Sequence, residues 1–273
     1  MRRGELVSSL HLIHVPVCSS ALGRWAAVRK YGLAAWKNAS GQRGISRFDE
    51  GQALHHLLTE LFGKRAIHPY RAFCAADRIH LEVYGYSSYD HQSLKQIARE
   101  TGLPDALAVC DVDRILSRQM PRYWNVGRRV GFETRVRPVS RLEYKLPRRD
   151  NSTFKRGAEI DTFLVEAMRR FPNPTTSTNS MRQAGRTREA VYTDWLAARL
   201  GSVAQLCPGV RMSSFSRSRV ARTGNSPEGP DAILRGELVI RDPAEFAKVL
   251  AKGVGRHKAY GCGMLLLRPA QMV

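Results

Sequence analysis

Two adjacent histidines carry the most recognisable chemistry in this sequence. His55 and His56 lie within a segment whose leucines recur at the spacing of one helix face: Leu54, Leu57, Leu58 and Leu61. At about 100° per residue, His55 flanks this apolar face and His56 points away from it, towards solvent. An imidazole with a pKa near ~6.5 exchanges protons at neutral pH, so we expect His55 to transfer a proton. His56 is the alternative, because a shift of one residue would exchange the two.

The helix that positions these histidines has clear local signals. Asp49 can cap a helix that spans Glu50–Phe62 and stops at Gly63, and Gln52 occupies the third helical position. Three arginines precede His55 in the chain and could stabilise developing charge: Arg24 in an expected first helix, and Arg43 and Arg47 in the loop before Asp49. Each of the three could instead contact a backbone phosphate.

The charge of the whole chain predicts a polyanionic partner. Its 273 residues contain 44 Lys and Arg against 24 Asp and Glu, which gives a net charge of +20 and a pI of about 10.4. Hydrophobic residues make up 43% of the chain, enough for one large domain or two small ones. No apolar run reaches the ~18 residues of a membrane span, and His11 and His14 interrupt the N-terminal segment. We therefore expect a cytoplasmic protein with no membrane partner.

The cysteines and short motifs indicate no cofactor. Five scattered cysteines, with no CxxC pair, favour neither a zinc site nor a disulfide framework: Cys18, Cys74, Cys110, Cys207 and Cys262. The sequence also lacks GxxxxGK[ST], GxGxxG and HExxH. We expect no metal and no cofactor, so any chemistry must come from side chains.

The order of expected elements is that of an α+β protein. Strands are expected at 8–17, 71–86 (or a hairpin), 128–139, 234–240 and 264–267, and helices at 21–30, 50–62, 92–101, 192–200 and 242–250. Strands and helices thus alternate without the regular succession of a parallel βαβ fold.

Basic residues concentrate in one strand and one arm. Between Arg114 and Arg149 there are eleven Lys and Arg and two acids, and Arg135 and Arg137 share one face of the expected strand. That geometry suits a phosphate backbone, with a solvated surface as the alternative. A second basic segment, residues 211–222, carries Arg217, Arg219 and Arg222 and is either an RNA-binding arm or a mobile loop.

Residues 142–188 have the composition of an insertion. Polar stretches flank one amphipathic helix, expected at Ala158–Phe171, that bears Arg169 and Arg170. Three apolar turns alone are marginal in water, so this helix either packs on the body or orders when a partner binds.

A glycine-dense loop precedes the last strand. It contains Gly253, Gly255, Arg256, His257, Lys258, Tyr260, Gly261 and Gly263. Its backbone could approach a phosphate closely, with charge from Arg256 and Lys258 and a stacking face from Tyr260. His257 is expected to be an RNA contact of this loop rather than an acid. Glycines needed only for their φ angles are the alternative explanation.

This loop, together with the His55 helix, resembles the CRISPR repeat-RNA endonucleases of the CasE-type branch. Those proteins end in G-[IV]-G-x-x-K-x-x-G-x-G, and Gly253, Gly255, Lys258, Gly261 and Gly263 occupy all five fixed places. The branch carries its catalytic histidine early in the chain within L/M-H-x-x-L, matched by Leu54-His55-His56-Leu57-Leu58, and an arginine-bearing strand matched by RRVGFETRVRPV.

The sequence departs from the branch at two places. Gln52 stands where some members have a tyrosine three residues before the histidine. The insertion at 142–188 is closer to type IV CRISPR relatives, some of which use arginines in place of histidine.

The resemblance implies a fold and a reaction. The fold would be two tandem ferredoxin-like (RRM-like) domains, residues 1–125 and 126–273, the second with the helical insertion 142–188. The reaction would be metal-independent cleavage of precursor crRNA at the base of a repeat hairpin, by attack of a ribose 2′-hydroxyl that leaves a 2′,3′-cyclic phosphate. The implied partners are CRISPR repeat RNA, the mature crRNA and other CRISPR effector subunits. Alternatives are a non-catalytic guide-RNA-binding subunit and a general nucleic-acid-binding module.

Overall fold

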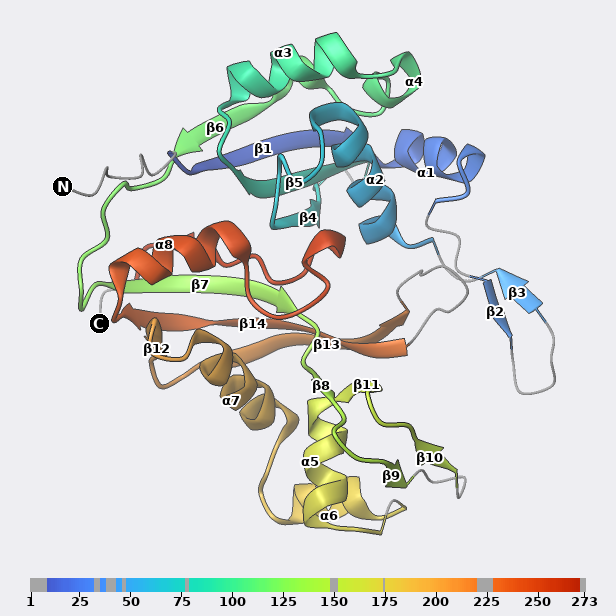
Figure 1. Ribbon diagram of the computed structural model, residues 1–273, viewed down its shortest axis with the longest axis vertical. Coiled ribbons are helices and arrows are strands. Elements are labelled where there is room, and N and C mark those ends of the chain that lie inside the picture. Colours follow the sequence, from blue (N-terminus) through green and yellow to red (C-terminus); the bar gives the residue numbers. More distant parts are fainter. Residues whose placement is uncertain are drawn as a thin grey trace.

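The structure is a computed structural model that describes residues 9–31, 35–37, 43–45, 48–76, 79–147, 152–173, 175–219 and 228–270. Within these ranges the chain forms two main antiparallel sheets, one in each half of the sequence (Figure 1). None of the described helices combines the length and the apolar composition needed to cross a bilayer.

The first sheet has the strand order β4-β5-β1-β6, formed by β1 (His11–Cys18), β4 (Tyr70–Cys74), β5 (His80–Ser87) and β6 (Leu116–Gln119). Its helices are α1 (Ser19–Val28), α2 (Glu50–Phe62), α3 (His91–Thr101) and the short α4 (Pro104–Leu107), followed by the 3₁₀ turn η1 (Val112–Arg114). Alternate residues of the strands, such as Ile13, Val15 and Val83, are fully buried with apolar residues of these helices in one core. A small pair, β2 (Ala35–Lys37) and β3 (Arg43–Ile45), lies between α1 and α2.

The second sheet has the order β12-β14-β7-β15, with β13 also paired to β14. Its strands are β7 (Arg129–Val136), β12 (Ala204–Leu206), β13 (Arg211–Arg219), β14 (Glu228–Ile240) and β15 (Leu266–Arg268). Two helices, α7 (Arg188–Leu200) and α8 (Pro243–Lys252), bury Tyr192, Leu196 and Phe246 in a second core with Phe132 and Leu234 of the sheet. The 3₁₀ turn η2 (Lys258–Tyr260) lies in the glycine loop between α8 and β15.

Both halves follow the βαββαβ succession of a ferredoxin-like fold. Each places its first and third main strands side by side in the middle of the sheet, β1 with β5 and β7 with β14. The expected α+β class is confirmed. Strand β6 ends at Gln119 and β7 begins at Arg129, and a domain division at 125/126 stays a prediction within that connection.

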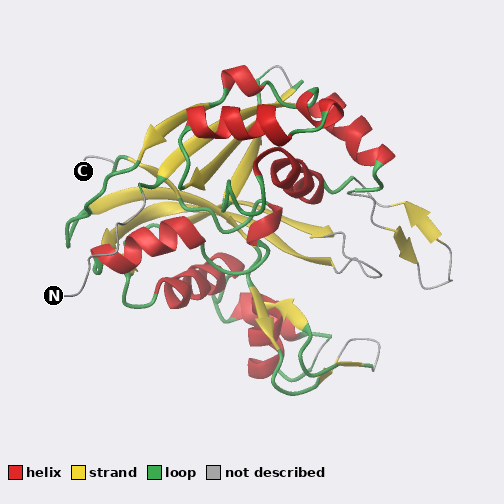
Figure 2. Cartoon of the chain, turned by 45° about the horizontal axis from the view of Figure 1, so that its top comes forward, coloured by secondary structure: helices red, strands yellow, loops and turns green. Residues whose placement is uncertain are grey.

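The insertion contains more structure than the one helix expected. Two strand pairs, β8 (Val139–Arg141) with β11 (Glu159–Asp161) and β9 (Leu146–Pro147) with β10 (Thr153–Phe154), accompany α5 (Thr162–Arg170) and α6 (Ser177–Gln183) (Figure 2). The predicted start at Ala158 is wrong because residues 159–161 pair with β8, and Asp161 then caps α5 by accepting a hydrogen bond from the Phe163 amide. Phe163, Ala167 and Met181 join the second core, so the insertion packs on the body.

The basic segment 211–222 is also more regular than a loop. Arg211–Arg219 forms β13, which pairs antiparallel with β14 over its whole length and has one irregularity between Met212 and Ser214. The mobile-loop alternative is therefore wrong for these residues, whereas Arg222 lies outside the described residues.

Candidate active site and nucleic-acid interface

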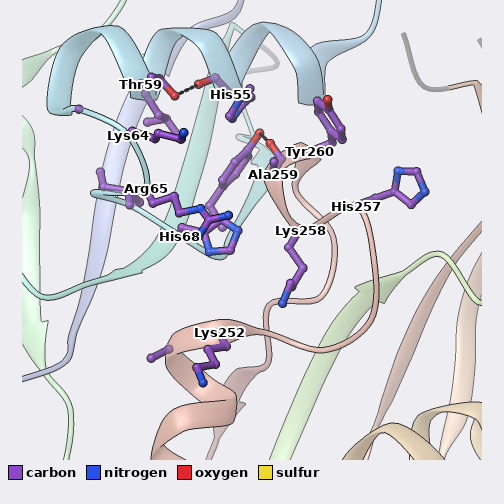
Figure 3. A pocket seen from close by; sticks show the side chains of 15 residues that line it. His55, Thr59, Lys64, Arg65, His68, Lys252, His257, Lys258, Ala259 and Tyr260 are labelled. Atoms are coloured by element: carbon purple, nitrogen blue, oxygen red, sulfur yellow. Dashed lines mark hydrogen bonds between the residues drawn. The ribbon is translucent and has the colours of Figure 1, made fainter. Parts of the chain in front are cut away.

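Local sequence places His55 on the flank of α2. The helix begins as expected, with the Asp49 carboxylate accepting a hydrogen bond from the Gln52 amide, and its leucine face is buried. His55 is half-buried at the edge of this face and lines a pocket of about 700 Å³. A helix anchored along one side thus presents one imidazole to a hollow (Figure 3).

The pocket is built from segments that are far apart in the chain. Its walls are α2, the segment that follows α2, the end of α8 and the glycine loop. The polar and aromatic side chains that line it are His55, Thr59, Lys64, Arg65, His68, Tyr70, Lys252, His257, Lys258 and Tyr260. Because none of the described lining residues is acidic, four cations face one hollow without a carboxylate in its wall.

Tyr70 joins the glycine loop to α2. Its hydroxyl donates to the Gly51 carbonyl at 2.7 Å and to the Ala259 carbonyl at 3.0 Å. The approach is so close that a Cβ on Gly51 would lie 2.6 Å from the Tyr260 carbonyl oxygen. Tyr260 then meets His55 edge to face, with ring centroids 5.7 Å apart. The loop therefore fixes an aromatic ring against the candidate catalytic imidazole.

The glycines shape this loop. Gly253, Gly255, Gly261 and Gly263 all have φ between 69° and 79°, a region that side chains disfavour. A Cβ on Gly255 would also lie 2.7 Å from the Trp195 ring. Gly253 and Gly255 are thus required by backbone geometry and packing, and their expected approach to a phosphate stays a prediction. The loop presents Lys258 and Tyr260 to the pocket (Figure 3).

The pocket lowers the pKa of several bases. Burial lowers the pKa of His55, and burial, with help from Lys258, Arg65 and His55, lowers that of His68 to about 4. Burial and the neighbouring charges of Arg65 and Lys252 also lower the pKa of Lys258. At neutral pH, His55 is consequently a neutral imidazole that can accept a proton. The same pocket is lined by Lys258, an ammonium group that gives up its proton more readily than usual.

The other expected catalytic residues lie elsewhere. His56 is half-buried and stacks on Tyr31, with ring centroids 3.8 Å apart, so its expected solvent exposure is wrong. Arg24 is exposed on α1 and does not line the pocket. The backbone of Arg43 lies in β3, and Arg47 falls outside the described residues.

Sequence reasoning missed four basic residues of the pocket: Lys64, Arg65, His68 and Lys252. Lys64 and Arg65 directly follow Gly63, the glycine that ends α2. This basic pair could have been recognised from its position next to the His55 helix. Nothing local indicates that the end of α8, almost 200 residues further on, supplies Lys252.

Two residues of the glycine loop connect it to the insertion. Arg256 forms an ion pair with Glu159 of β11, and the His257 Nε2 lies 3.3 Å from the same carboxylate. Figure 3 shows His257 directed away from the other labelled side chains. The expected role of His257 as an RNA contact of the loop stays a prediction.

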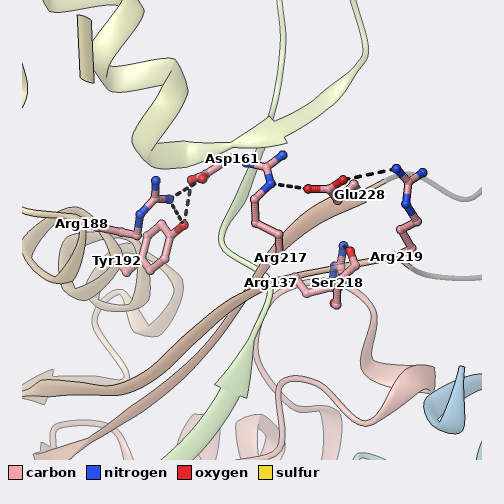
Figure 4. A network of polar contacts seen from close by, with 8 residues as sticks. All are labelled: Arg137, Asp161, Arg188, Tyr192, Arg217, Ser218, Arg219 and Glu228. Atoms are coloured by element: carbon pink, nitrogen blue, oxygen red, sulfur yellow. Dashed lines mark hydrogen bonds and ion pairs between the residues drawn. The ribbon is translucent and has the colours of Figure 1, made fainter. Parts of the chain in front are cut away.

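The arginines of the second sheet are held by internal partners. Arg135 binds the buried Asp231 through two hydrogen bonds, of 2.8 and 2.5 Å. Arg137 is only 4% exposed and donates to the Ser218 hydroxyl and carbonyl at 2.6 and 3.0 Å (Figure 4). Their expected contact with an RNA backbone stays a prediction, and Arg137 would have to leave a buried position to make it.

Four arginines of β13 and the insertion are more exposed than Arg135 and Arg137. Arg217 and Arg219 share the carboxylate of Glu228 at 2.5 and 3.4 Å (Figure 4). Arg169 and Arg170 end α5, where Arg170 lies 3.1 Å from Glu166. The expected contact of these four guanidinium groups with RNA stays a prediction.

A buried cluster holds the insertion against α7. Asp161 accepts hydrogen bonds from Arg188 and from the Tyr192 hydroxyl, the latter at 2.8 Å (Figure 4). The Arg188 guanidinium also lies 4.3 Å from the ring centroids of both Phe163 and Phe215. The cluster fixes β11 and α5, and through Glu159 it also supports the glycine loop.

Comparison with known proteins finds a family model and several solved structures that match most of this chain. A family model described as "CRISPR associated protein" matches residues 34–269. The solved structure "CRISPR endoribonuclease Cse3 bound to 19 nt RNA" matches with a TM-score of 0.58 at 15% identity, covering 96% of this chain and 100% of that one. A search of curated protein sequences finds no significant match.

Two further solved structures give similar values. Cse3 of Thermus thermophilus, bound to an RNA representing a pre-cleavage complex, has a TM-score of 0.57 at 14% identity, with 96% and 100% of the two chains covered. Cas6e from Escherichia coli K-12 has a TM-score of 0.56 at 16% identity, with 95% and 100% covered. At such identities the likeness establishes a common fold.

Proposed function

The chain belongs to the family of CRISPR-associated proteins, and we propose that it is an endoribonuclease that cleaves precursor crRNA at the base of a repeat hairpin. The observation that carries the proposal is the pocket itself, in which His55 is half-buried, has a lowered pKa and faces Tyr260. Several cations line the same pocket, and none of its described lining residues carries a carboxylate. The solved structures that share the fold include Cse3 and Cas6e, and Cse3 is named an endoribonuclease and is bound to RNA.

The proposed reaction uses a nucleophile from the substrate. The ribose 2′-hydroxyl next to the scissile phosphate attacks phosphorus, so that the O2′–P bond forms and the P–O5′ bond breaks. Neutral His55 accepts the proton of the 2′-hydroxyl, and the leaving 5′-oxygen takes a proton from Lys258. The products are a 2′,3′-cyclic phosphate and a 5′-hydroxyl, and no metal ion takes part in these steps.

The remaining pocket residues would stabilise the negative charge of the phosphorane and position the His55 ring. Lys64, Arg65 and Lys252 line the hollow in which negative charge would develop on the phosphorane. Tyr260 packs edge to face on His55 and limits the orientations of its ring. In this proposal Tyr260 takes the place of the helix tyrosine whose position Gln52 occupies.

The rest of the molecule would hold the hairpin and its product. A-form RNA has a major groove too deep and narrow for side chains to read, so contacts to phosphates are expected along β13 and α5. Retention of the mature crRNA would allow the protein to join other CRISPR effector subunits.

The test is cleavage of a labelled repeat hairpin in excess EDTA, beside the same RNA with one 2′-deoxyribose at the scissile position. We expect cleavage of the first RNA, a 2′,3′-cyclic phosphate on its product, and no cleavage of the second. Binding of the hairpin without any cleavage would contradict the proposal and indicate a guide-RNA-binding subunit. Equal affinity for hairpin and random RNA would indicate a general nucleic-acid-binding module.

A further inference from the structure

A second hollow lies directly beside the candidate active site. It has a volume of about 580 Å³ and lies between α8, the first sheet and the connection from β6 to β7. It shares Arg65, His68 and Ala251 with the His55 pocket. A chain molecule that passes His55 can therefore continue into this hollow without leaving the protein surface.

The floor of the second hollow is apolar and firmly packed. Tyr86 and Trp124 are almost fully buried, and the Tyr86 hydroxyl donates to the Leu265 carbonyl at 2.8 Å. Trp124 packs edge to face on Phe246, with ring centroids 5.2 Å apart. Ala244 and Ala247 of α8 complete this floor. Such a surface accepts flat apolar groups and offers few polar partners.

The rim of the same hollow is cationic and aromatic. Arg65 and Arg122 are exposed on it, and none of its described lining residues is acidic. Tyr123 also lines it, although 86% of its surface is exposed. Tyr123 thus offers an accessible aromatic face next to an apolar floor, on which another flat ring could stack.

A third hollow, of about 470 Å³, adjoins the second one. It shares Tyr86 and Arg122 with the second and adds Arg118 at the end of β6. Its described lining also lacks acids. The three hollows thus form one succession with cations along it: Lys64, Lys252, Lys258, Arg65, Lys248, Arg122 and Arg118. Of these, Lys248 forms an ion pair with Glu245 at 2.6 Å.

We propose that the second and third hollows, named here the flank groove, bind unpaired nucleotides that flank the scissile phosphate. Bases would lie on the apolar floor, one would stack on Tyr123, and the phosphates would meet Arg122 and Arg65. This inference rests on the proposed function, because it requires that RNA occupy the His55 pocket. The occupant is a single strand, since exposed bases can stack on aromatic rings whereas bases within a stem cannot.

RNA explains the flank groove better than a protein partner does. The groove is continuous with the His55 pocket, so both are expected to hold one molecule. Several cations, with no acidic residue among the described lining of either hollow, also complement a row of phosphates.

The test compares three RNAs in equilibrium binding to the full chain, each with a 2′-deoxyribose at the scissile position so that it is not cleaved. The short RNA is the repeat hairpin with a single nucleotide on each side of the scissile phosphate. The two extended RNAs add unpaired nucleotides on one flank or on the other. Wild-type protein should bind one of the extended RNAs about tenfold or more tightly than the short one. The Tyr123→Ala variant should lose most of this gain, and Arg122→Ala should lose a part that shrinks as salt rises.

Tyr144→Ala is the matched control, because Tyr144 is 77% exposed but lines no part of the flank groove. It should bind the short RNA and both extended RNAs like wild type. Tyr123 is exposed, so its substitution should leave the melting temperature unchanged, and melting curves of all variants check this.

Several outcomes would overturn the inference. If wild type cleaves the short hairpin in its all-ribose form but gains nothing from either extension, the flank groove is not an RNA site, and a protein partner becomes its better occupant. If the gain persists in Tyr123→Ala and Arg122→Ala, the extension binds elsewhere. If wild type neither binds nor cleaves any hairpin, the proposed function itself fails, and the flank groove fails with it.

Discussion

Two basic regions of this molecule differ in how their charges are matched. In the His55 pocket, Lys64, Arg65, Lys252 and Lys258 face one hollow whose described wall contains no carboxylate. On the second sheet, Arg135 is bound by Asp231, and Arg217 and Arg219 share Glu228. These basic side chains of the second sheet are therefore matched by carboxylates, whereas those of the pocket face no described acidic lining residue. Net charge alone would not separate them.

The burial of the ion pairs sharpens this difference. Burial opposes the ionisation of Asp231, but the hydrogen bonds from Arg135 outweigh that cost and lower its pKa. The Asp231–Arg135 pair holds β14 to β7 from inside the protein. In the pocket, burial acts without such compensation and favours the neutral forms of His55 and His68.

The largest expected effect is on catalysis. We predict that His55→Ala lowers the single-turnover cleavage rate by about 10²–10⁴-fold, because it removes the base. Filter binding should show nearly unchanged affinity for the hairpin. The matched control is His56→Ala, which removes a ring stacked on Tyr31 outside the pocket and should retain most of the rate. A larger loss in the control would exchange the roles of the two histidines.

The next effect is on stability and concerns the second sheet. Asp231→Ala leaves the guanidinium of Arg135 without its buried partner and should lower the free energy of unfolding by about 3–5 kcal/mol. Glu228→Ala, on the same strand, removes a carboxylate from an exposed ion pair and should cost no more than about 1 kcal/mol. Urea denaturation measures both, and equal losses would contradict the distinction between buried and exposed pairs.

The pH dependence of stability should reveal His68. Its pKa is about 4 in the folded protein and near 6.5 when unfolded, so between these values the unfolded chain binds more protons. The contribution of His68 is therefore complete above pH 6.5 and is lost as the pH falls towards 4. Melting temperatures of wild type should decline more steeply over this range than those of His68→Gln. Parallel curves for the two proteins would refute the assignment.

The smallest expected effect is on the salt dependence of RNA binding. Each lost phosphate contact should reduce the slope of log K against log salt by about 0.7–0.9. Replacing Lys64 and Lys252 by alanine should therefore reduce it by about 1.5. Replacing Arg217 and Arg219 should reduce it less, because the change also frees the carboxylate of Glu228. A larger reduction in the second variant would reverse the comparison.

Local signals predicted much of the fold. Asp49 and Gly63 delimit α2 as expected, and Asp242 caps α8 through the Glu245 amide. The start of α5 was wrong because residues 159–161 pair with a strand some 20 residues earlier, which no helical periodicity can indicate. Helix α6 was missed because its sequence, STNSMRQ, buries only two side chains.

The site residues could be predicted only where they lie within a motif that is local in the sequence. His55, Lys258 and Tyr260 were found in the α2 helix and the glycine loop, and the structure brings them into one pocket. Arg65, His68 and Lys252 join them through tertiary packing, without a spacing that sequence could display. For the same reason, the capture of Arg135 by Asp231, almost 100 residues away, could not be anticipated.

The central claim is that a neutral His55 accepts a proton in this pocket. The most direct measurement is the cleavage rate of His55→Ala as imidazole is added, at several pH values, with the folded state checked by melting. We predict that imidazole restores part of the lost rate, in proportion to its neutral form, and that the wild-type rate rises with pH to a plateau with a midpoint below 6.5. A folded His55→Ala protein that cleaves like wild type, or a wild-type rate that is flat across this range, would contradict the claim.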